Sequence, residues 1–282
     1  MHLGIVAKRD TERAVGLADR IRRSVDATVS VDELTGTRLG VDGRSVGALS
    51  ACDLVVSIGG DGTFLFTARE VSPTPIMGVN LGEVGFLNAV SPDDCVEAVR
   101  AATERPRAGE AELQELPQIR ASGEDGARTD EERGEGVWTL PPAVNEVVVL
   151  GPQRGRNNGL DLEVRIDGES YSEGHADGVL VSTPAGSSAY NLGEGGPLVH
   201  PDVSALVATE MCAEGSMPSI AVPTDSTLRV RIEGPDHAFV VADGRSRERV
   251  TPPTTVRLAL AADPVRVAGP RLDFFAALGK LE

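Results

Sequence analysis

The chain has 282 residues, 40% of them hydrophobic, which is enough for one large domain or two ordinary ones with a sizeable core in each. Its formal net charge of −16 predicts repulsion of nucleic acid and anionic membranes, so neither is an expected partner. No apolar run reaches the roughly 18–20 residues that span a bilayer, and we expect no secretory signal. Three scattered cysteines (Cys52, Cys95 and Cys212) form no disulfide framework and no metal-ligand pattern. A reduced, cytoplasmic protein is therefore expected.

The basic residues are almost all arginine. Lysine occurs only at Lys8 and Lys280, while Asp and Glu together number 43 against 27 Lys and Arg. An acidic, lysine-poor surface is typical of proteins adapted to high salt, where screening removes the repulsion between carboxylates. A GC-rich genome would explain the scarce lysine but not the excess of acidic residues. The composition therefore favours a halophilic source.

Strand-like and helix-like segments alternate through the first third of the chain. The apolar run 53–60 has the continuous hydrophobic character of a strand buried on both faces. The segment 12–25 has apolar residues at helical spacing, and Ser91 is a plausible cap for a helix after it. The pattern predicts strands at 3–8, 27–32, 53–60 and 75–82, and helices at 12–25, 63–71 and 92–103. Residues 1–120 are thus expected to form a Rossmann-like domain with a parallel sheet.

The pattern then changes to successive strands separated by Asp-Gly and Pro turns. We expect an acidic, Gly-rich loop at 121–138, a mainly β domain at 139–267, and an amphipathic helix at 268–282 that returns to the first domain. Asp243-Gly244 is read as a hairpin turn. The predicted strands are 143–151, 160–171, 178–184, 219–223, 227–233, 238–245 and 255–261.

The motif Gly-Gly-Asp-Gly at 59–62 ends the apolar strand and opens the next helix. Glycines before a helix N-terminus are typical of phosphate sites, because the backbone N–H groups are accessible and the helix end favours negative charge. A carboxylate would repel a phosphate unless it binds a cation or takes a proton from a nucleophilic hydroxyl. Asp61 therefore suggests phosphoryl transfer, while the alternative is a turn residue that caps the helix.

Two further stretches bear on this choice. VNLGEVGFLNAV at 79–90 is a second strand-to-turn motif. DGVLVSTPAGSSAY at 177–190 runs a strand into a Thr-Pro turn and a segment of small and hydroxyl residues, followed by Gly-Glu-Gly-Gly-Pro. Small residues allow a ligand to lie against the backbone, although such a segment can also be an ordinary loop between strands.

Together these motifs resemble the NAD kinase family. The match comprises Gly59 to Gly62, an N-x-G-x-x-G-F-L segment from Asn80 to Leu87, the pair Asn145-Glu146, the block Asp177–Tyr190 and a C-terminal pattern at 275–281. The block is specific, whereas Gly-Gly-Asp-Gly alone also occurs in lipid kinases and phosphofructokinases. The resemblance implies an α/β domain followed by a β-rich domain that binds NAD.

The resemblance also implies roles for individual residues. Asp61 would accept the proton of the 2′-hydroxyl of the adenosine ribose as that oxygen attacks the terminal phosphate of ATP. The residues expected around the ATP phosphates are Gly59, Gly60, Gly62 and Thr63. The residues expected to bind NAD are Asp61, Gly62, Phe86, Asn145, Glu146, Asp177, Ser188, Ala189, Tyr190, Gly193 and, by an approximate match, Cys212. Mg²⁺ or another divalent cation would offset phosphate charge, no metal ligands are assigned, and a homodimer or homotetramer is expected.

The sequence departs from the family pattern at three places. Ser188 replaces a frequent Thr and keeps the hydroxyl, while Gly193 replaces a frequent Ser and loses a donor. The segment 209–223 lacks the His-Ser element found in many members, which leaves the choice between NAD and NADH open. A kinase for a lipid or sugar hydroxyl and a non-catalytic dinucleotide-binding paralogue are the alternative functions.

Overall fold

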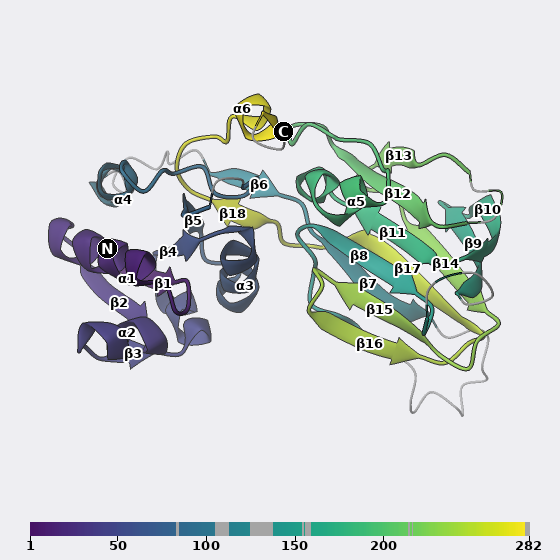
Figure 1. Ribbon diagram of the computed structural model, residues 1–282, viewed down its shortest axis with the longest axis horizontal. Coiled ribbons are helices and arrows are strands. Elements are labelled where there is room, and N and C mark those ends of the chain that lie inside the picture. The colour runs from purple at the N-terminus through teal and green to yellow at the C-terminus, as the bar shows by residue number, and fades with distance from the viewer. Residues whose placement is uncertain are drawn as a thin grey trace. The chain divides into compact units, whose positions relative to one another are not determined.

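The computed structural model describes residues 1–82, 85–104, 113–124, 138–153, 155, 159–213, 215 and 217–279 (Figure 1). The chain divides into two compact units. The first unit comprises Met1–Leu116 together with Asp263–Glu282, and the second comprises Pro117–Ala262. Among the described residues, no helix is both long and apolar enough to cross a membrane.

The first unit is built on a seven-stranded sheet. Its strands lie in the order β3-β2-β1-β4-β5-β18-β6, and all neighbours pair in parallel except β18 and β6. Every residue of β4 is buried, as expected for a strand covered on both faces. The strands are β1 (His2–Ala7), β2 (Thr28–Asp32), β3 (Gly43–Arg44), β4 (Leu54–Gly59), β5 (Ile76–Asn80), β6 (Gln114–Leu116) and β18 (Val265–Val267). The expected parallel α/β architecture is thus confirmed.

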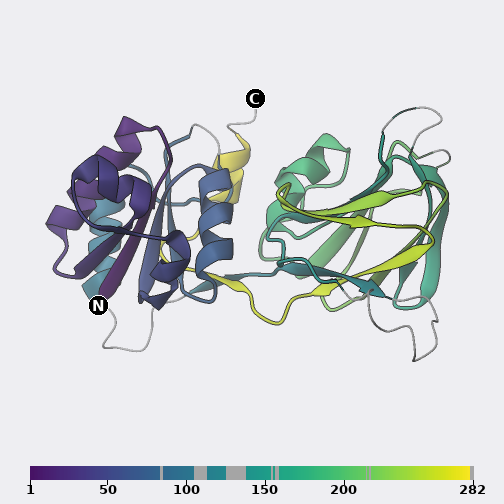
Figure 2. The same ribbon diagram turned by 90° about the horizontal axis from the view of Figure 1, so that it is seen from below.

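Helices cover both faces of this sheet (Figure 2). On one face, Leu17 and Ile21 of α1 share a core with Val99 of α4. On the other face, Leu49 of a 3₁₀ helix and Val71 of α3 pack against β1 and β4. The helices are α1 (Glu12–Ser24), α2 (Glu33–Leu39), the 3₁₀ helix η1 (Val46–Ala51), α3 (Asp61–Val71), α4 (Cys95–Glu104) and α6 (Phe274–Leu278). Ser91 caps the turn before α4, because its Oγ accepts from the Asp94 N–H at 3.2 Å.

The C-terminal segment completes the first unit. Val267 pairs in parallel with Ile76, and the Ala268 N–H donates to the Ile76 carbonyl at 2.8 Å. Phe274 of α6 packs edge-on against Phe86, with ring centroids 6.0 Å apart. A C-terminal helix therefore returns to the first unit as expected, but it spans Phe274–Leu278 rather than 268–282, and Lys280–Glu282 lie outside the described residues.

The second unit is a sandwich of two antiparallel sheets. One sheet has the order β10-β9-β14-β17-β7 and the other β13-β12-β11-β8-β15-β16. Apolar side chains that alternate along the strands, such as Val147, Val149, Val179 and Val230, form the core between them. The strands are β7 (Ile119–Glu124), β8 (Glu146–Leu150), β9 (Leu160–Ile166), β10 (Glu169–Ala176), β11 (Gly178–Ser182), β12 (Ala205–Met211), β13 (Ile220–Pro223), β14 (Leu228–Glu233), β15 (Ala238–Ala242), β16 (Ser246–Val250) and β17 (Thr254–Leu260).

The boundaries of the units differ slightly from those predicted. The first ends at Leu116 rather than 120, and the second ends at Ala262 rather than 267. The acidic loop predicted at 121–138 is wrong for its first residues, because β7 pairs with β17 as far as Glu124. A Cβ on Gly123 would lie 2.6 Å from Trp138 Nε1, so this glycine makes room for the indole on the strand. Residues 125–137 lie outside the described residues.

The strand β12 was absent from the predicted set. It pairs with β11 over five residues, and six of its seven residues are buried. It lies between β13 and β11 and pairs with both, so its strand conformation is supported by neighbours on each side.

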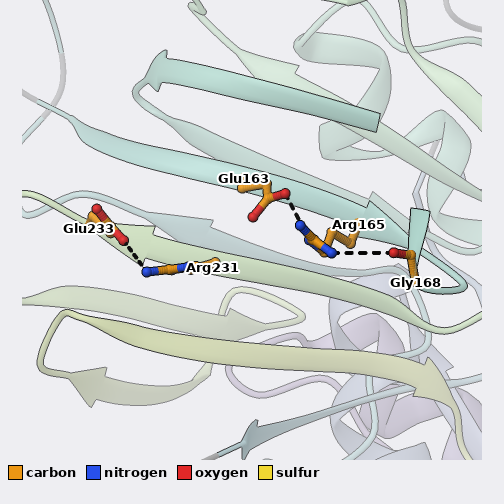
Figure 3. Close-up of polar contacts among 5 residues, drawn as sticks. All are labelled: Glu163, Arg165, Gly168, Arg231 and Glu233. Atoms are coloured by element: carbon orange, nitrogen blue, oxygen red, sulfur yellow. Dashed lines mark hydrogen bonds and ion pairs between the residues drawn. The ribbon is translucent and has the colours of Figure 1, made fainter. Parts of the chain in front are cut away.

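Charged side chains on the five-stranded sheet form short ion pairs along its strands (Figure 3). Arg165 Nε lies 2.7 Å from Glu163 Oε1 on β9, and Arg231 Nη2 lies 2.6 Å from Glu233 Oε1 on β14. Arg165 also donates to the Gly168 carbonyl at 3.4 Å. Both arginines are about half exposed, so each pair contributes little to stability, typically about 0–1 kcal/mol.

Candidate functional site

The Gly-Gly-Asp-Gly motif forms the junction between β4 and α3. The strand ends at Gly59, Gly60 is the N-cap, and Asp61 is the first helical residue. The Thr63 and Phe64 N–H groups donate to the Gly60 carbonyl at 2.9 and 3.1 Å, which starts the helix immediately after the glycines. Thr63 lies directly over Gly59, because a Cβ there would be 2.6 Å from Thr63 Cβ. Gly59 is therefore required by close packing within the turn.

Gly60 and Gly62 differ from Gly59, because a Cβ on either would meet no atom within 4 Å. Both therefore border open space at the N-terminus of an eleven-residue helix. A helix N-terminus carries a partial positive charge and directs backbone N–H groups outward, which suits a phosphate. This end of α3 has the room and the polarity that phosphate binding requires.

The Asp61 carboxylate connects this motif to the segment after β5. Asp61 Oδ2 accepts from the Phe86 N–H at 2.8 Å. Asp61 Oδ1 accepts from the Leu87 N–H at 3.2 Å and from Asn88 Nδ2 at 2.8 Å. A carboxylate offers about four acceptor positions, so the described residues leave one, on Oδ2. The alternative that Asp61 caps the helix is wrong, because Gly60 is the N-cap and the Asp61 carboxylate accepts from residues 86–88 instead.

Three residues lie close to the Asp61 site in the same unit, and two of them, Phe86 and Asn80, were expected from the sequence motifs. Phe86 is partly buried and contacts Phe274, which places its ring beside the Asp61-bound backbone. Asn80 closes the start of its turn, because its Oδ1 accepts from the Gly82 N–H at 2.9 Å. Asn88 was not predicted as a site residue, and its only sequence signal is its place directly after Gly85-Phe86-Leu87.

The second group of expected residues lies in the second unit, beginning with Asn145-Glu146 at the start of β8. Asn145 and Glu146 are 9% and 7% exposed, and Asn145 Oδ1 and Glu146 Oε2 are buried without a hydrogen-bond partner in the part of the chain that is described. The cross-strand neighbour of Glu146 is Ser182, whose Oγ is likewise buried and unpaired there. Buried polar atoms without partners are unfavourable, so this cluster is suited to a polar ligand.

Glu146 has an unusual proton affinity. Burial, and secondarily the negative charge of Asp243, raise its pKa from 4.5 to about 7, while the Tyr190 backbone N–H opposes the change. Glu146 therefore changes charge near neutral pH. Perturbed carboxyl groups of this kind are common at functional sites.

The block 177–190 docks directly on Asn145. The Thr183 N–H donates to the Asn145 carbonyl at 2.9 Å, and Thr183 Oγ1 donates to the Val144 carbonyl at 2.6 Å. Gly186 lies against the same carbonyl, since a Cβ there would be 2.0 Å from the Asn145 oxygen. The block therefore needs small residues because its backbone packs closely against the backbone at Asn145. It is not an ordinary loop between strands.

The rest of the block forms a short 3₁₀ helix, η2 (Ala185–Ser188), and a short helix, α5 (Tyr190–Gly193). Tyr190 packs on Val148, Leu180 and Met211, which project from the outer face of the six-stranded sheet. Ser188 is partly buried, while Ala189 and Gly193 are exposed. Val148, Leu180 and Met211 form an apolar strip on this face of the sheet, which ends at Glu146. The predicted residues of the block border this strip.

Asp177 and Cys212 lie together at the other end of β11. The Asp177 N–H donates to the Met211 carbonyl at 2.9 Å, and Asp177 Oδ1 accepts from the Gly155 N–H at 2.9 Å. Cys212 is exposed and follows with a left-handed φ of 50°. Asp177 and Ser182 are five positions apart along the chain, about 17 Å in an extended strand. The sheet therefore presents polar groups at both ends of an apolar strip.

A resident metal ion is a poor fit to the described residues, which contain no group of three His, Cys, Asp or Glu side chains that could hold one. Asp61 is the carboxylate at the phosphate-compatible turn, and most of its acceptor positions are already used. Mg²⁺ often binds through substrate phosphates, water and one or two carboxylates.

Comparisons with known proteins agree with these features. Residues 44–106 match the family model for the ATP-NAD kinase N-terminal domain, and residues 144–268 match that for the ATP-NAD kinase C-terminal domain. The chain is 67% identical to the NAD kinase of Natronomonas pharaonis and 50% identical to that of Halobacterium salinarum, with 100% of each chain covered in both cases.

Solved structures share the fold. The crystal structure of yeast NADH kinase complexed with NADH has a TM-score of 0.84 at 18% identity, covering 100% of this chain and 87% of that one. The NAD kinase from Archaeoglobus fulgidus in complex with ATP has a TM-score of 0.73 at 24% identity, covering 100% and 98%. Full-length identity of 67%, both family models and the shared fold lead to one conclusion: the chain belongs to the NAD kinase family.

Proposed function

We propose that this chain transfers the terminal phosphoryl group of ATP to the 2′-hydroxyl of the adenosine ribose of NAD, with Asp61 as the general base. In the step, the 2′-oxygen forms a bond to the terminal phosphorus while the bond from that phosphorus to the bridging oxygen of ADP breaks. Asp61 takes the hydroxyl proton, so the products are NADP and ADP. ATP-dependent phosphorylation of NAD is the activity of the family, and the roles of individual residues are proposed here.

One observation carries the assignment of Asp61. Its carboxylate is fixed by three hydrogen bonds from residues 86–88 and retains an acceptor position on Oδ2. A base held in this way does not have to be ordered during the reaction, which favours proton transfer.

The phosphate donor is assigned to the glycine turn. Gly60 and Gly62 leave open space at the start of α3, and Thr63 adds a hydroxyl at the same place. We assign the ATP phosphates to Gly59, Gly60, Gly62 and Thr63, with a divalent cation carried by the nucleotide. Because the cation travels with ATP, activity is expected to require Mg²⁺ or another divalent ion at concentrations comparable to that of ATP.

In the second unit, NAD is assigned to the outer face of the six-stranded sheet. In the first unit, Phe86 is assigned to NAD because the resemblance to the family implies it. Glu146, Asn145 and Ser182 supply the buried, unpaired oxygens that ribose hydroxyls would satisfy. Asp61, Gly62, Asp177, Ser188, Ala189, Tyr190, Gly193 and Cys212 complete the proposed set. A homodimer or homotetramer remains part of the proposal and follows from the resemblance to the family. A cytoplasmic location is also proposed, because the three scattered cysteines suit a reducing environment.

The test is formation of NADP from NAD and ATP with Mg²⁺, measured for the wild type and for Asp61→Asn. We expect product with the wild type and loss of most turnover with the variant, while NAD still binds. Wild-type protein that binds NAD without turnover would support the non-catalytic alternative, and substitution of polyphosphate for ATP would then test the donor. Omission of Mg²⁺, with EDTA added, is expected to abolish the reaction.

A further inference from the structure

We propose that Asp243, in the turn between β15 and β16, is a positioning residue that holds Asn145-Glu146 in the conformation that binds the dinucleotide. The proposal rests on the function above, which makes this pair a contact for NAD. It assigns a role to a residue that the sequence presents only as part of an Asp-Gly hairpin turn.

Asp243 makes four hydrogen bonds to three consecutive residues. Oδ2 accepts from the Val144 N–H at 2.9 Å, and Oδ1 accepts from the N–H groups of Asn145 and Glu146 at 2.8 and 3.2 Å. Its own N–H donates to the Glu146 carbonyl at 3.0 Å. Hydrogen bonds to an ionised carboxylate are stronger than neutral ones. The backbone of the pair is therefore fixed from a turn 97–99 residues away in the sequence.

A second Asp-Gly turn in the same unit shows how little an ordinary turn requires. Asp167 has a left-handed φ of 51°, close to the 47° of Asp243, and a Gly also follows it. Its side chain accepts from the Thr227 N–H at 2.8 Å, and its own N–H donates to the Thr227 carbonyl at 3.0 Å. The Asp167 turn is hydrogen-bonded to one residue, Thr227. The Asp243 carboxylate instead accepts from three N–H groups, those of residues 144–146.

Asp243 also affects the pKa of Glu146. Its carboxylate is the neighbouring charge that adds to burial in raising the pKa of Glu146, and the Tyr190 N–H of α5 opposes both. On the other neighbouring strand, β11, the residue paired with Glu146 is the uncharged Ser182. Removal of the Asp243 charge should therefore lower the pKa of Glu146, an effect that a loss of turn stability alone would not produce.

The experiment compares Asp243→Asn with Asp167→Asn in the full-length protein. Asparagine adopts left-handed backbone conformations readily, so both turns are expected to persist. Asp243→Asn should raise the NAD dissociation constant and KM about tenfold, with the KM for ATP changed less than twofold. The midpoint of the pH dependence of NAD binding should move to lower pH. Asp167→Asn should lower thermal stability about as much as Asp243→Asn does, but it should leave NAD binding and its pH profile unchanged.

Two results would overturn the proposal. One is a folded Asp243→Asn protein whose NAD dissociation constant lies within twofold of the wild type. The other is a ¹³C NMR titration of Glu146 that does not move in that variant. Glu146→Gln separates this failure from failure of the NAD contact. If Glu146→Gln leaves NAD affinity unchanged, the pair is not a contact for NAD, and the role of Asp243 fails with that assignment; failure of the proposed function itself would be absence of NADP formation by the wild type. If only Asp243→Asn has no effect, the contact stands and the role of Asp243 is wrong.

Discussion

The side-chain amide of Asn88 donates to the carboxylate of Asp61, with Nδ2 2.8 Å from Oδ1. Asn88 is 3% exposed, and Gly78 makes room for it, because a Cβ there would lie 2.3 Å from Asn88 Oδ1. A buried amide at a fixed position thus orients the proposed base. Asp61 thus contributes the proton acceptor and Asn88 contributes its orientation. Substitution of each residue in turn can measure the two contributions.

Asp61→Asn should lower kcat by a factor of about 10²–10⁴, the usual contribution of a general base. The amide retains one acceptor oxygen but presents an NH₂ group to donors at residues 86–88, so some loss of stability is also expected. Steady-state kinetics together with urea unfolding would measure both. A variant with nearly wild-type turnover would remove Asp61 from the proton transfer.

Asn88→Ala should lower kcat about tenfold and leave both KM values within about twofold, because the base remains but is less well oriented. The control is Thr67→Val, which removes a buried polar group of the same unit, a hydroxyl, without changing the side-chain volume much. Its Oγ1 donates to the Thr63 carbonyl at 2.8 Å. Similar losses of kcat in the two variants would show that the effect of Asn88 is one of general stability.

The raised pKa of Glu146 predicts a pH-dependent stability. An acid whose pKa is higher in the folded state than in the unfolded state stabilises the fold at low pH. That contribution is lost as the pH rises from 4.5 to about 7 and is constant above it. The loss is at most about 3 kcal/mol, from 1.36 kcal/mol per pKa unit. Urea unfolding at pH 5, 6, 7 and 8 should show this slope in the wild type and a flatter curve in Glu146→Gln.

The same carboxyl group should make NAD binding depend on pH. An ionised Glu146 is the stronger acceptor for ribose hydroxyls, so NAD affinity is expected to increase from pH 6 to pH 8. Calorimetric titration would measure it, and Glu146→Gln should show weaker binding with little pH dependence. An affinity that falls over this range would indicate that protonated Glu146 is the binding form.

Gly186→Ala should disrupt the NAD site, because the added Cβ would lie 2.0 Å from the Asn145 carbonyl oxygen and one backbone would have to move. We expect at least a tenfold increase in the NAD dissociation constant and a lower melting temperature. Gly16→Ala is the control, since a Cβ there meets no atom within 4 Å and alanine favours the helix by roughly 0.5–1 kcal/mol. Unchanged NAD binding in Gly186→Ala would contradict the close approach of the two segments.

The net charge of −16 predicts that salt stabilises the protein. At 1 M ionic strength the Debye length is about 3 Å, against about 10 Å at 0.1 M, so repulsion between surface carboxylates is largely screened. The melting temperature and the rate of NADP formation should therefore both rise between 0.1 M and 2 M KCl. Full activity at low salt, with a decline at high salt, would reject the salt adaptation inferred from composition and leave the kinase assignment intact.

Much of the local structure follows from local sequence. The apolar run at 54–58 followed by two glycines determines a buried strand, a sharp turn and a helix N-terminus, because each depends on neighbouring residues alone. The hairpin at Asp243-Gly244 follows from the preference of these residues for left-handed conformations. The single strand predicted at 160–171 is wrong, because Asp167-Gly168 forms a second hairpin turn that divides it into β9 and β10. The combination of motifs was also sufficient to identify the family.

The functional contacts depend on residues far apart in the sequence. Asp61 binds residues 86–88, Asp243 binds residues 144–146, and Val267 extends the sheet beside Ile76. A hydrogen-bond partner at such a separation is set by strand order and register, which local patterns do not encode. The sequence by itself determined which residues are chemically suited to phosphoryl transfer and where most strands and helices of the parallel α/β unit lie. Only the tertiary structure decided which backbone groups hold Asp61 and Glu146 in place, because those groups become neighbours only when the sheets are assembled.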